Sequence, residues 1–386
     1  EDIDFFKYAN ETRNVEFETD TNNYLVCAIC GRKFRQLAQH LLLTHGLTKS
    51  QYIEQYGETL FTCQASHEKQ SIASKLNNVN GNHVFTKHST AEKEIIDFIN
   101  ELGISCQSDR HILDGQEIDI LIPDFGIGIE YNGNVWHTED QHPDHRYHLN
   151  KTILAFSKGI NLIHIFEDEY HLHKDIVLSK IRHILHKDNV LPAIDGRKCQ
   201  IKEIQMSMAL DFLNENHIQG GVGATIYLGA FYKDQLVAVM SFLNEGNGVW
   251  NLNRSCSDIH YRCRGISGKL FKYFTEHYQS RYRVIKSFLD RRWCVCETKN
   301  IYTQLGFTFD GYVGPDYRYY NSKVDRYQRF HKFGFRKDKL LKKYPEVLNK
   351  DMTEREMTTT LGYSRIWDCG LIRYIYKNPI NTSTAT

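Results

Sequence analysis

The stretch EIDILIPDFGIGIEYNGNVWH, residues 117–137, predicts the centre of the fold. Apolar and polar side chains alternate over 117–123, which is the period of a half-buried strand, and a glycine turn follows. Residues 128–132 then predict a second strand. We therefore expect a hairpin that carries Asp119 on one strand and Glu130 on the next.

The sequence beyond the hairpin predicts a helix and a further strand. After a loop rich in His and Asp, residues 147–158 have helical spacing and Gly159 ends the helix. Residues 161–166 are apolar and predict a buried strand that stops at an acidic run. The order of strand, turn, strand, helix and strand indicates a mixed α/β core.

Carboxylates on neighbouring strands are suited to hold a hard divalent cation. Asp119 and Glu130 form such a pair, and Mg²⁺ needs only a few protein oxygens because it keeps several waters. The cation would lower the pKa of a bound water, and His137 would accept the proton. The alternative is that both carboxylates are solvated and His137 is an ordinary loop residue. An unpaired buried carboxylate is costly, which favours the metal.

This segment resembles the very-short-patch-repair endonucleases, in the EDxHD variant found in phage and fractured-gene homing endonucleases. The resemblance covers residues 89 to about 187 and implies a restriction-like nuclease core of the PD-(D/E)xK type. The motifs that carry it are Ser89-x-x-Glu92, EIDILIP around Asp119, IEYNGNVWH at 129–137, YHLNK at 147–151 and KGINLIHIFEDEY at 158–170.

The resemblance also implies the roles of several residues. It implies a magnesium ion held by Asp119 and the backbone carbonyl of Tyr131, with His137 as the base and Glu92 as a helix-borne acid. Glu92 also completes a capping box with Ser89, so a purely structural role stays open. The last aspartate of the group is missing, and its region offers other polar residues, namely His148, Asn150 and Lys151.

Residues 24–57 predict a zinc finger. Cys27-x2-Cys30 is followed by His40 and His45, and two thiolates with two imidazoles suit a closed tetrahedral Zn²⁺ site. A unit this short buries too little apolar surface to fold without such support. The alternative is a pair of reduced thiols beside two surface histidines.

The finger resembles the Ros/MucR bacterial finger, including its trailing GLTKSQYIEQYG. In that family the finger is a DNA-binding module, which implies double-stranded DNA as a partner. Phosphate positioning is the more general role for its polar side chains. The implied contacts are Arg32, Lys33, Arg35 and Gln36.

Residues 197–320 predict a second domain, of the α+β class. Arg262-Cys-Arg-Gly265-Ile-Ser-Gly268 is a glycine-rich turn opening a helix, which presents backbone N–H groups to a phosphate. The region resembles the GNAT acyltransferase superfamily, which binds the acetyl-CoA pyrophosphate at that turn. Ser267 departs from the usual turn and no clear general base stands out. The sequence therefore favours a structural or DNA-contacting role over acetyl-CoA binding.

Residues 321–386 predict a basic region that contacts DNA. The rest of the chain is predicted as an N-terminal arm (1–23), a polar linker (58–88) and the nuclease domain (89–190). The cations that form the predicted C-terminal phosphate contact are Lys332, Arg336, Lys337 and Lys339.

Composition limits how the protein could bind DNA and where it is expected to act. The net charge of +1 excludes a global field, so DNA affinity must come from local basic faces. The sequence has no long apolar run and no signal peptide, and its ten Cys are expected to be reduced, so we expect a cytoplasmic protein without membrane contact. We expect it to act as a monomer or a transient dimer on DNA.

Three functions follow from these motifs. The first is a site-specific homing endonuclease that hydrolyses phosphodiester bonds with Mg²⁺ at a long target read by the appended modules. The second is a nucleic-acid-targeted acetyltransferase with an inactive nuclease core. The third is a mismatch-nicking repair endonuclease.

Overall fold

The computed structural model describes residues 24–35, 37–57, 61–65 and 89–379. The chain forms two compact units, Glu1–Lys87 and His88–Thr386, and each is described by itself. The predicted arm, Gln36 and most of the predicted linker lie outside the described residues.

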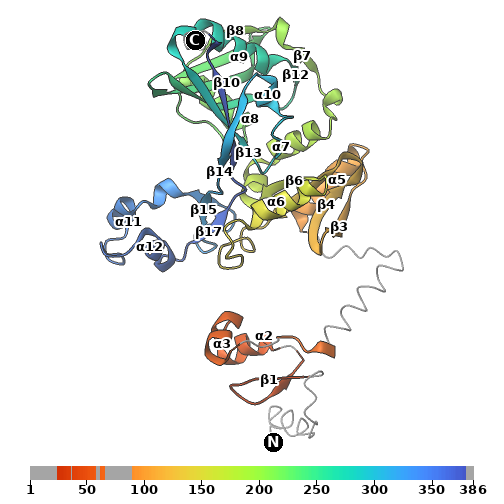
Figure 1. Ribbon diagram of the computed structural model, residues 1–386, viewed down its shortest axis with the longest axis vertical. Helices are drawn as coiled ribbons and strands as arrows, with labels where there is room; N and C mark the ends of the chain where they lie inside the picture. Colours follow the sequence, from red (N-terminus) through yellow and green to blue (C-terminus); the bar gives the residue numbers. More distant parts are fainter. Residues whose placement is uncertain (1–23, 36, 58–60, 66–88, 380–386) are drawn as a thin grey trace, which may run out of the picture. The chain divides into compact units, whose positions relative to one another are not determined.

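The first unit contains a small zinc-finger-like fold (Figure 1). Strands β1 (Leu25–Val26) and β2 (Lys33–Phe34) form a hairpin, and α2 (Ala38–His40) runs into a π-helical turn, Leu41–His45. A capping box at Thr48 opens α3 (Lys49–Tyr56). Only a few side chains, including Leu37, Leu41 and Tyr52, are buried together. This core is too small to hold the unit without further support.

The finger extends beyond its predicted end at residue 57. The backbone N–H of Leu37 donates to the carbonyl of Phe61, and the N–H of Cys63 donates to the carbonyl of Arg35. Phe61 also packs against the small core of the finger. The first described residues of the predicted linker therefore belong to the finger.

The second unit begins with a four-stranded sheet in the order β3-β4-β5-β6. Pairing is antiparallel from β3 to β5 and parallel between β5 and β6. Isoleucine-rich faces pack under α5 and α7 on one side and α6 on the other. The bounds are β3 Gln107–Leu113, β4 Gln116–Ile122, β5 Ile127–Asn132, β6 Asn161–Phe166, α5 Thr90–Glu101, α6 Tyr147–Ser157 and α7 Glu167–Ile184.

A seven-stranded sheet forms the other large part of this unit, in the order β14-β18-β13-β11-β10-β9-β8. Helix α9 packs on one face of it, through Leu270, Phe271 and Phe274. The strands are β8 Gln200–Glu203, β9 Ile226–Tyr232, β10 Gln235–Gly246, β11 Val249–Ser257, β13 Val284–Asp290, β14 Thr308–Val313 and β18 Leu371–Lys377. The helices are α8 Met206–Asn216, α9 Ile266–His277 and α10 Ile301–Gln304.

Short elements complete the unit. β7 (Ala193–Asp195) pairs in parallel with β12 (Arg262–Arg264), just before α9. The 3-10 turns are Pro123–Phe125, Asp188–Val190, Gly196–Lys198, Gln279–Arg281 and Lys332–Phe335. Among the helices of the described residues, none combines the length and apolar character that crossing a membrane requires.

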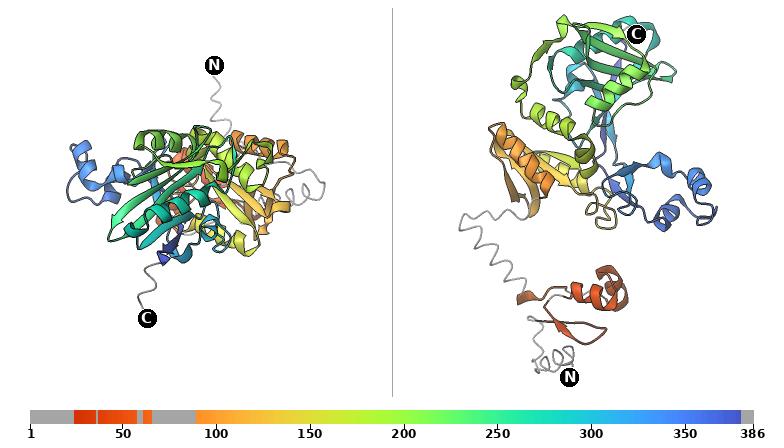
Figure 2. Two further views of the ribbon diagram at one scale, coloured as in Figure 1. Left: turned by 90° about the horizontal axis from the view of Figure 1, so that it is seen from above. Right: turned by 180° about the vertical axis from the view of Figure 1, so that it is seen from behind.

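The C-terminal region does not form a separate tail after residue 320. Strand β18 returns to the seven-stranded sheet and pairs with both β13 and β14. Ile372 and Tyr374 of β18 are fully buried there, which explains why the strand is held in the sheet. The residues before it form an insertion with its own small core, which projects to one side in both views of Figure 2.

The insertion contains a three-stranded sheet in the order β16-β15-β17 and two helices. Their bounds are β15 Tyr317–Tyr320, β16 Arg329–His331, β17 Ser364–Trp367, α11 Lys337–Lys343 and α12 Glu354–Thr360.

Buried ion pairs join the insertion and the seven-stranded sheet to the four-stranded sheet. Arg292, which follows β13, contacts Glu169 of α7 at 2.6 Å and Asp290 at 2.6 Å. Arg329 of β16 contacts Asp168 at 2.7 Å. The acidic run after β6, which the sequence indicated only as a strand end, therefore receives two arginines from distant parts of the chain.

Candidate functional site

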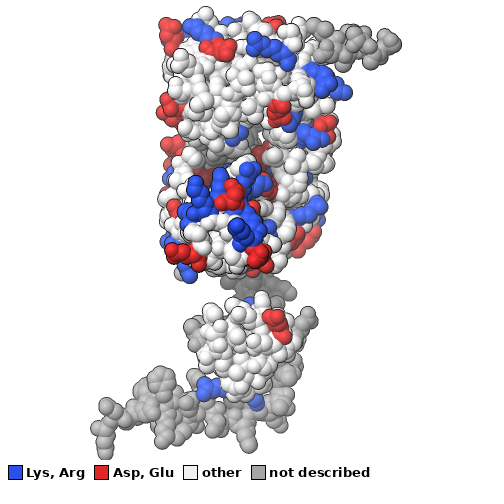
Figure 3. Space-filling model, turned by 90° about the vertical axis from the view of Figure 1, so that its left-hand side faces the viewer, with Lys and Arg blue, Asp and Glu red and all other residues white. Residues whose placement is uncertain are grey.

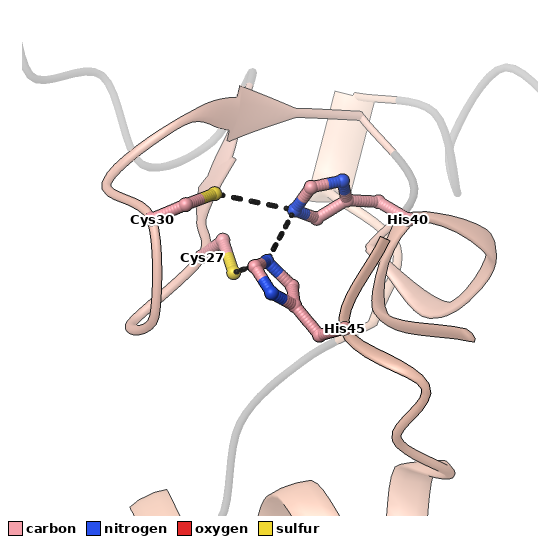
Figure 4. Close-up of side chains that lie close together, drawn as sticks. All are labelled: Cys27, Cys30, His40 and His45. Carbon is pink, nitrogen blue, oxygen red and sulfur yellow. Dashed lines mark hydrogen bonds between the residues drawn. The ribbon is translucent and has the colours of Figure 1, made fainter. Parts of the chain in front are cut away.

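The four predicted zinc ligands lie together in the finger (Figure 4). Their ligand atoms, from Cys27, Cys30, His40 and His45, lie within 4.8 Å of one another. The Cys30 Sγ to His40 Nε2 distance is 3.3 Å, and Cys27 Sγ lies 3.6 Å from His45 Nε2. The two imidazole Nε2 atoms are 3.1 Å apart.

These distances fit a tetrahedral zinc ion. Zinc bonds of normal length place neighbouring sulfur and nitrogen ligands about 3.6 Å apart and two nitrogens about 3.3 Å apart. Burial, followed by the nearby His45, lowers the pKa of His40, so its ring is neutral as a ligand must be. The predicted DNA-contacting side chains Arg32, Lys33 and Arg35 are exposed on the same unit.

Three of the predicted catalytic residues meet on the four-stranded sheet. Asp119 lies on β4, Glu130 on β5 and Lys151 on α6. Lys151 Nζ contacts Glu130 Oε2 at 2.5 Å, in surroundings where both side chains are buried. The backbone N–H of Tyr131 donates to Asp119 Oδ2 at 2.9 Å. The carboxylates are thus partnered by a lysine and by a backbone amide.

Burial dominates the ionisation of this cluster. It raises the pKa of Asp119 to about 6. Burial together with the neighbouring Asp119 raises the pKa of Glu130 to about 8. Burial alone would lower the pKa of Lys151, but Glu130 outweighs it and raises that pKa. The cluster therefore retains protons near neutral pH.

The other predicted catalytic residues lie around the cluster in different roles. His137 Nδ1 is 2.9 Å from His148 Nε2, and burial lowers the pKa of His137 to about 3. The N–H of Glu92 donates to Ser89 Oγ, which is the capping interaction at the start of α5. Within the described residues, the finger is the only place where three or more Cys, His, Asp or Glu ligand atoms gather closely enough for a metal.

A second candidate site comes from a divergence of two parallel strands. β11 and β13 pair only over Val249–Asn251 and Val284–Lys286. Beyond this point β11 stays with β10, and β13 stays with β18. The facing edges of residues 252–257 and 287–290 separate, and we call this opening the fork. Strand edges that lose their partner offer N–H and C=O groups to a ligand.

The N-terminus of α9 opens onto a cavity of about 720 Å³. Gly265 adopts a left-handed conformation there (φ 69°), and the helix has no side-chain cap and no acidic residue in its first turn. Gly196 packs directly against this turn, because a Cβ at Gly196 would lie 3.0 Å from backbone atoms of Gly265. The charged side chains that line the cavity are Asp195, Arg197, Arg264, Lys269, Lys272 and Glu276.

Two further cavities, of about 500 and 550 Å³, adjoin the fork. Both are lined by Lys180 and His183 of α7, by His217 and by Ser255–Ser257 of β11. Burial, with smaller contributions from Arg254 and Lys180, lowers the pKa of His217 to about 3. This imidazole is therefore neutral at pH 7.

The sequence contains one signal for Lys180. Ile176, Lys180 and Ile184 are spaced by four residues, so Lys180 interrupts the apolar stripe of its helix. His217 and Trp293 had no comparable signal, because they lie outside regular elements and reach the fork only through tertiary folding.

The four cations predicted to contact phosphate in the insertion have different surroundings. Lys332 is paired with Asp316 at 2.7 Å, which neutralises much of its charge. Arg336, Lys337 and Lys339 are exposed, and Arg336 stacks over the ring of Phe333 at 4.1 Å. Figure 3 shows Lys and Arg side chains gathered on the face of the molecule from which the insertion projects.

Comparison with known proteins supports the finger. The model of the ROS/MUCR transcriptional regulator protein family matches residues 10–76. The predicted zinc finger is confirmed at this level by the match and by the four gathered ligands. A comparison with curated proteins finds no match.

Solved acetyltransferase structures are similar to the larger unit. A GNAT family acetyltransferase from Elizabethkingia anophelis with acetyl-CoA bound shares 12% identity over 47% of this chain and 98% of its own, with a TM-score of 0.27. A Bacillus acetyltransferase in complex with CoA shares 13% identity over 47% and 99%, with a TM-score of 0.24. An aminoglycoside 6′-acetyltransferase type Ii shares 14% identity over 46% and 96%, with a TM-score of 0.26.

These TM-scores lie below 0.5, so the matches carry no argument about function. Such an argument must rest on the strand order, the fork and the glycine-rich turn before α9. The chain is a mixed α/β protein with a Cys/His zinc-finger-like first unit and a second unit that contains a four-stranded and a seven-stranded sheet. The residue roles predicted at Asp119, Glu130 and their neighbours stay predictions.

The comparisons correct the predicted function. The expectation of a site-specific homing endonuclease was wrong, because the matches are to a transcriptional regulator family and to acetyltransferases. The expectation that acetyl-CoA is an unlikely ligand receives no support from these matches, two of which hold acetyl-CoA or CoA. A catalytic Mg²⁺ receives no support from them.

Proposed function

We propose that the protein is a DNA-directed acyltransferase. In this proposal the finger binds double-stranded DNA, and the GNAT-like part binds an acyl-CoA and transfers its acyl group to an amine. The observation that carries the proposal is the fork between β11 and β13, which opens beside the uncapped N-terminus of α9.

The anionic end of a coenzyme A thioester fits the cavity at α9. The first N–H groups of a helix lack intrahelical acceptors and favour a phosphate. Arg264 and Lys269 line this cavity and add positive charge. Arg264 is held by Asp195 at 2.8 Å, and Lys269 Nζ donates to the carbonyl of Cys199 at 2.5 Å, so both side chains are positioned before any ligand binds.

The pantetheine arm of such a thioester fits the fork. The arm contains two amide groups, and the fork presents strand edges that have no strand partner on that side. The hydroxyl of Ser287 donates to the carbonyl of Leu252 at 2.7 Å, where the two strands begin to separate. Ser267 of the turn lines the fork cavity, and Gly265 and Gly268 of the same turn line the cavity at α9.

Acyl transfer to an amine requires a neutral amine and a group that takes up its proton. The imidazole of His217 lines the fork cavity and stays neutral at pH 7, because burial lowers its pKa to about 3. Its Nδ1 accepts a hydrogen bond from the backbone N–H of Gln219 at 3.1 Å, so the other ring nitrogen carries the hydrogen and solvent in the cavity takes up the proton of the amine. The acceptor amine would enter through the same cavity.

DNA binding is proposed for the finger, on the basis of its match to a regulator family. Arg32, Lys33 and Arg35 are exposed and would contact phosphates. We also propose the exposed cations of α11 as a second phosphate-contacting surface. Each phosphate contact makes affinity more sensitive to salt.

Calorimetric titration of the full-length protein with acetyl-CoA tests the proposal. Gly268→Asp places a carboxylate in the first turn of α9, where it favours the helix but repels a phosphate. Nothing lies within 4 Å of a Cβ at Gly268, so the substitution fits. We expect binding by the wild type and at least a tenfold loss in the variant. Gly334→Asp, at an equally open glycine of the insertion, is the matched control.

If millimolar acetyl-CoA gives no heat of binding in the titration, and CoA does not compete with it, the proposal is overturned. Equal affinity of the wild type and Gly268→Asp would place the binding elsewhere.

A further inference from the structure

Lys180 is a lysine that projects from α7 into the region of the fork. It lines both cavities that adjoin the fork, together with the outer residues of β11. Helix α7 follows the last strand of the four-stranded sheet, so this lysine reaches the seven-stranded sheet from another part of the unit. Its position is therefore set by the packing of the two sheets and not by the GNAT-like part alone.

The surroundings of Lys180 do not pair its charge. Its Nζ lies over the ring of Trp293, 4.3 Å from the centroid, and within the described residues no carboxylate lies within ion-pair distance of it. The nearby carboxylates of Asp290 and Glu169 are held by Arg292 at 2.6 Å each. A poorly solvated ammonium without a counter-ion favours loss of its proton, and burial lowers the pKa of Lys180.

Lys174 lies on the same helix as Lys180 but in different surroundings. Lys174 is exposed and forms an ion pair with Glu94 at 2.8 Å. Its charge is therefore paired at the surface, and it lines neither of the two cavities at the fork. The two lysines differ in surroundings and share the same helix.

We propose that Lys180 is an acyl acceptor of the protein itself, so that the chain acylates its own α7 from acyl-CoA bound in the fork. This inference rests on the proposed function, because that function supplies the acyl donor. The structure places an amine in the cavity where the thioester end of the donor would lie.

The step is an ordinary aminolysis of a thioester. The lone pair of neutral Lys180 Nζ attacks the carbonyl carbon, and a C–N bond forms as the C–S bond breaks. CoA leaves as a thiolate, and the proton released from Nζ ends on its sulfur. Solvent in the two cavities carries that proton, because Nδ1 of the neutral His217 ring already accepts the backbone N–H of Gln219. The products are N-acyl-lysine and free CoA, and no oxidant or further reactant is needed.

Mass spectrometry of the full-length protein after incubation with acetyl-CoA tests the proposal. We expect one acetyl group per chain, mapped to Lys180 in the peptide that contains α7. Lys180→Arg should abolish the modification while keeping a positive charge over Trp293. Lys174→Arg should leave it unchanged. Gly268→Asp should slow it at least tenfold, because it weakens donor binding.

Two further measurements distinguish modification by bound acetyl-CoA from reactivity of the lysine by itself. An acetyl thioester without the nucleotide, S-acetyl-N-acetylcysteamine, should modify Lys180 at least tenfold more slowly than acetyl-CoA at equal concentration. Equal rates would overturn the proposal, since the lysine would then be reactive by itself. If acetyl-CoA binds in calorimetry and Lys180 stays unmodified, the inference falls and the proposed function stands. If acetyl-CoA does not bind, the proposed function itself falls.

Discussion

The finger and the carboxylate cluster were predicted as metal centres from the same kind of observation, but they differ in how their charges are satisfied. In the finger, four ligand atoms from Cys27 to His45 face one another within 4.8 Å. In the cluster, Glu130 already has a cation, because Lys151 lies 2.5 Å from it. One site needs an ion to complete it, whereas the other contains its own counter-charge.

The difference teaches what a sequence motif can specify. The finger ligands belong to one short segment, so their spacing alone brings them together. The cluster depends on a helix whose lysine lies twenty-one residues beyond Glu130. Carboxylates on adjacent strands therefore predict a place where charge gathers, but they do not say whether a metal or a lysine neutralises it.

Removal of zinc is expected to have the largest effect. Cys30→Ala should lose the bound zinc and unfold the finger, since structural zinc contributes about 10 kcal/mol or more to such units. Zinc content by mass spectrometry and DNA binding by gel shift measure the two consequences. Glu130→Gln is the control at the other predicted metal site and should keep a full zinc content.

Retention of zinc by Cys30→Ala, or loss of zinc in Glu130→Gln, would contradict the comparison between the two sites.

The second-largest effect on stability is expected when a buried counter-charge is removed. Arg292→Met removes the arginine of Asp290 and leaves Glu169 with Arg329 alone, at 3.4 Å, in a buried setting, which costs about 3–5 kcal/mol. Urea denaturation of the full-length protein measures the change in the free energy of unfolding. Arg373→Met, which breaks the exposed pair with Asp310, should cost about 1 kcal/mol or less. Equal costs would show that the buried network does not join the parts of this unit.

The carboxylate cluster should make stability depend on pH. The folded pKa of Glu130 is raised to about 8 from 4.5, so the unfolded chain releases this proton first as pH rises. Stability therefore falls between about pH 4.5 and 8 by a few kcal/mol. Asp119, raised to about 6 from 3.8, acts in the same direction. The raised pKa of Lys151 acts only at higher pH.

The double variant Glu130→Gln/Lys151→Met removes both partners together and should flatten this pH dependence. Free energies of unfolding at pH 5 and pH 8 provide the measurement. An unchanged slope in the double variant would show that Glu130 is ionised in the folded protein across this range.

Much of the local structure could be predicted from the sequence. Alternation predicted β4 and β5, helical spacing ended by Gly159 predicted α6, and an apolar run predicted β6. These features depend on neighbouring residues, so a single sequence contains them. The metal ligands of the finger were identified for the same reason.

The parts that escaped prediction depend on distant contacts. The sequence did not show that β18 would leave the C-terminal region to pair with β13 and β14. It did not show that Arg292 and Arg329 would meet the acidic run after β6. The resemblance of the hairpin to nucleases predicted the wrong function, because it rested on the four-stranded sheet and the fork lies in the other sheet.

Hydrogen exchange of the full-length protein with and without CoA tests the central claim most directly. Amides of residues 252–257 that face away from β10 have no strand partner in the free protein, so CoA should protect them, together with the turn at Gly265 to Gly268. The hairpin of β4 and β5 should exchange at the same rate in both states. Protection confined to that hairpin, or no protection at saturating CoA, would contradict the account.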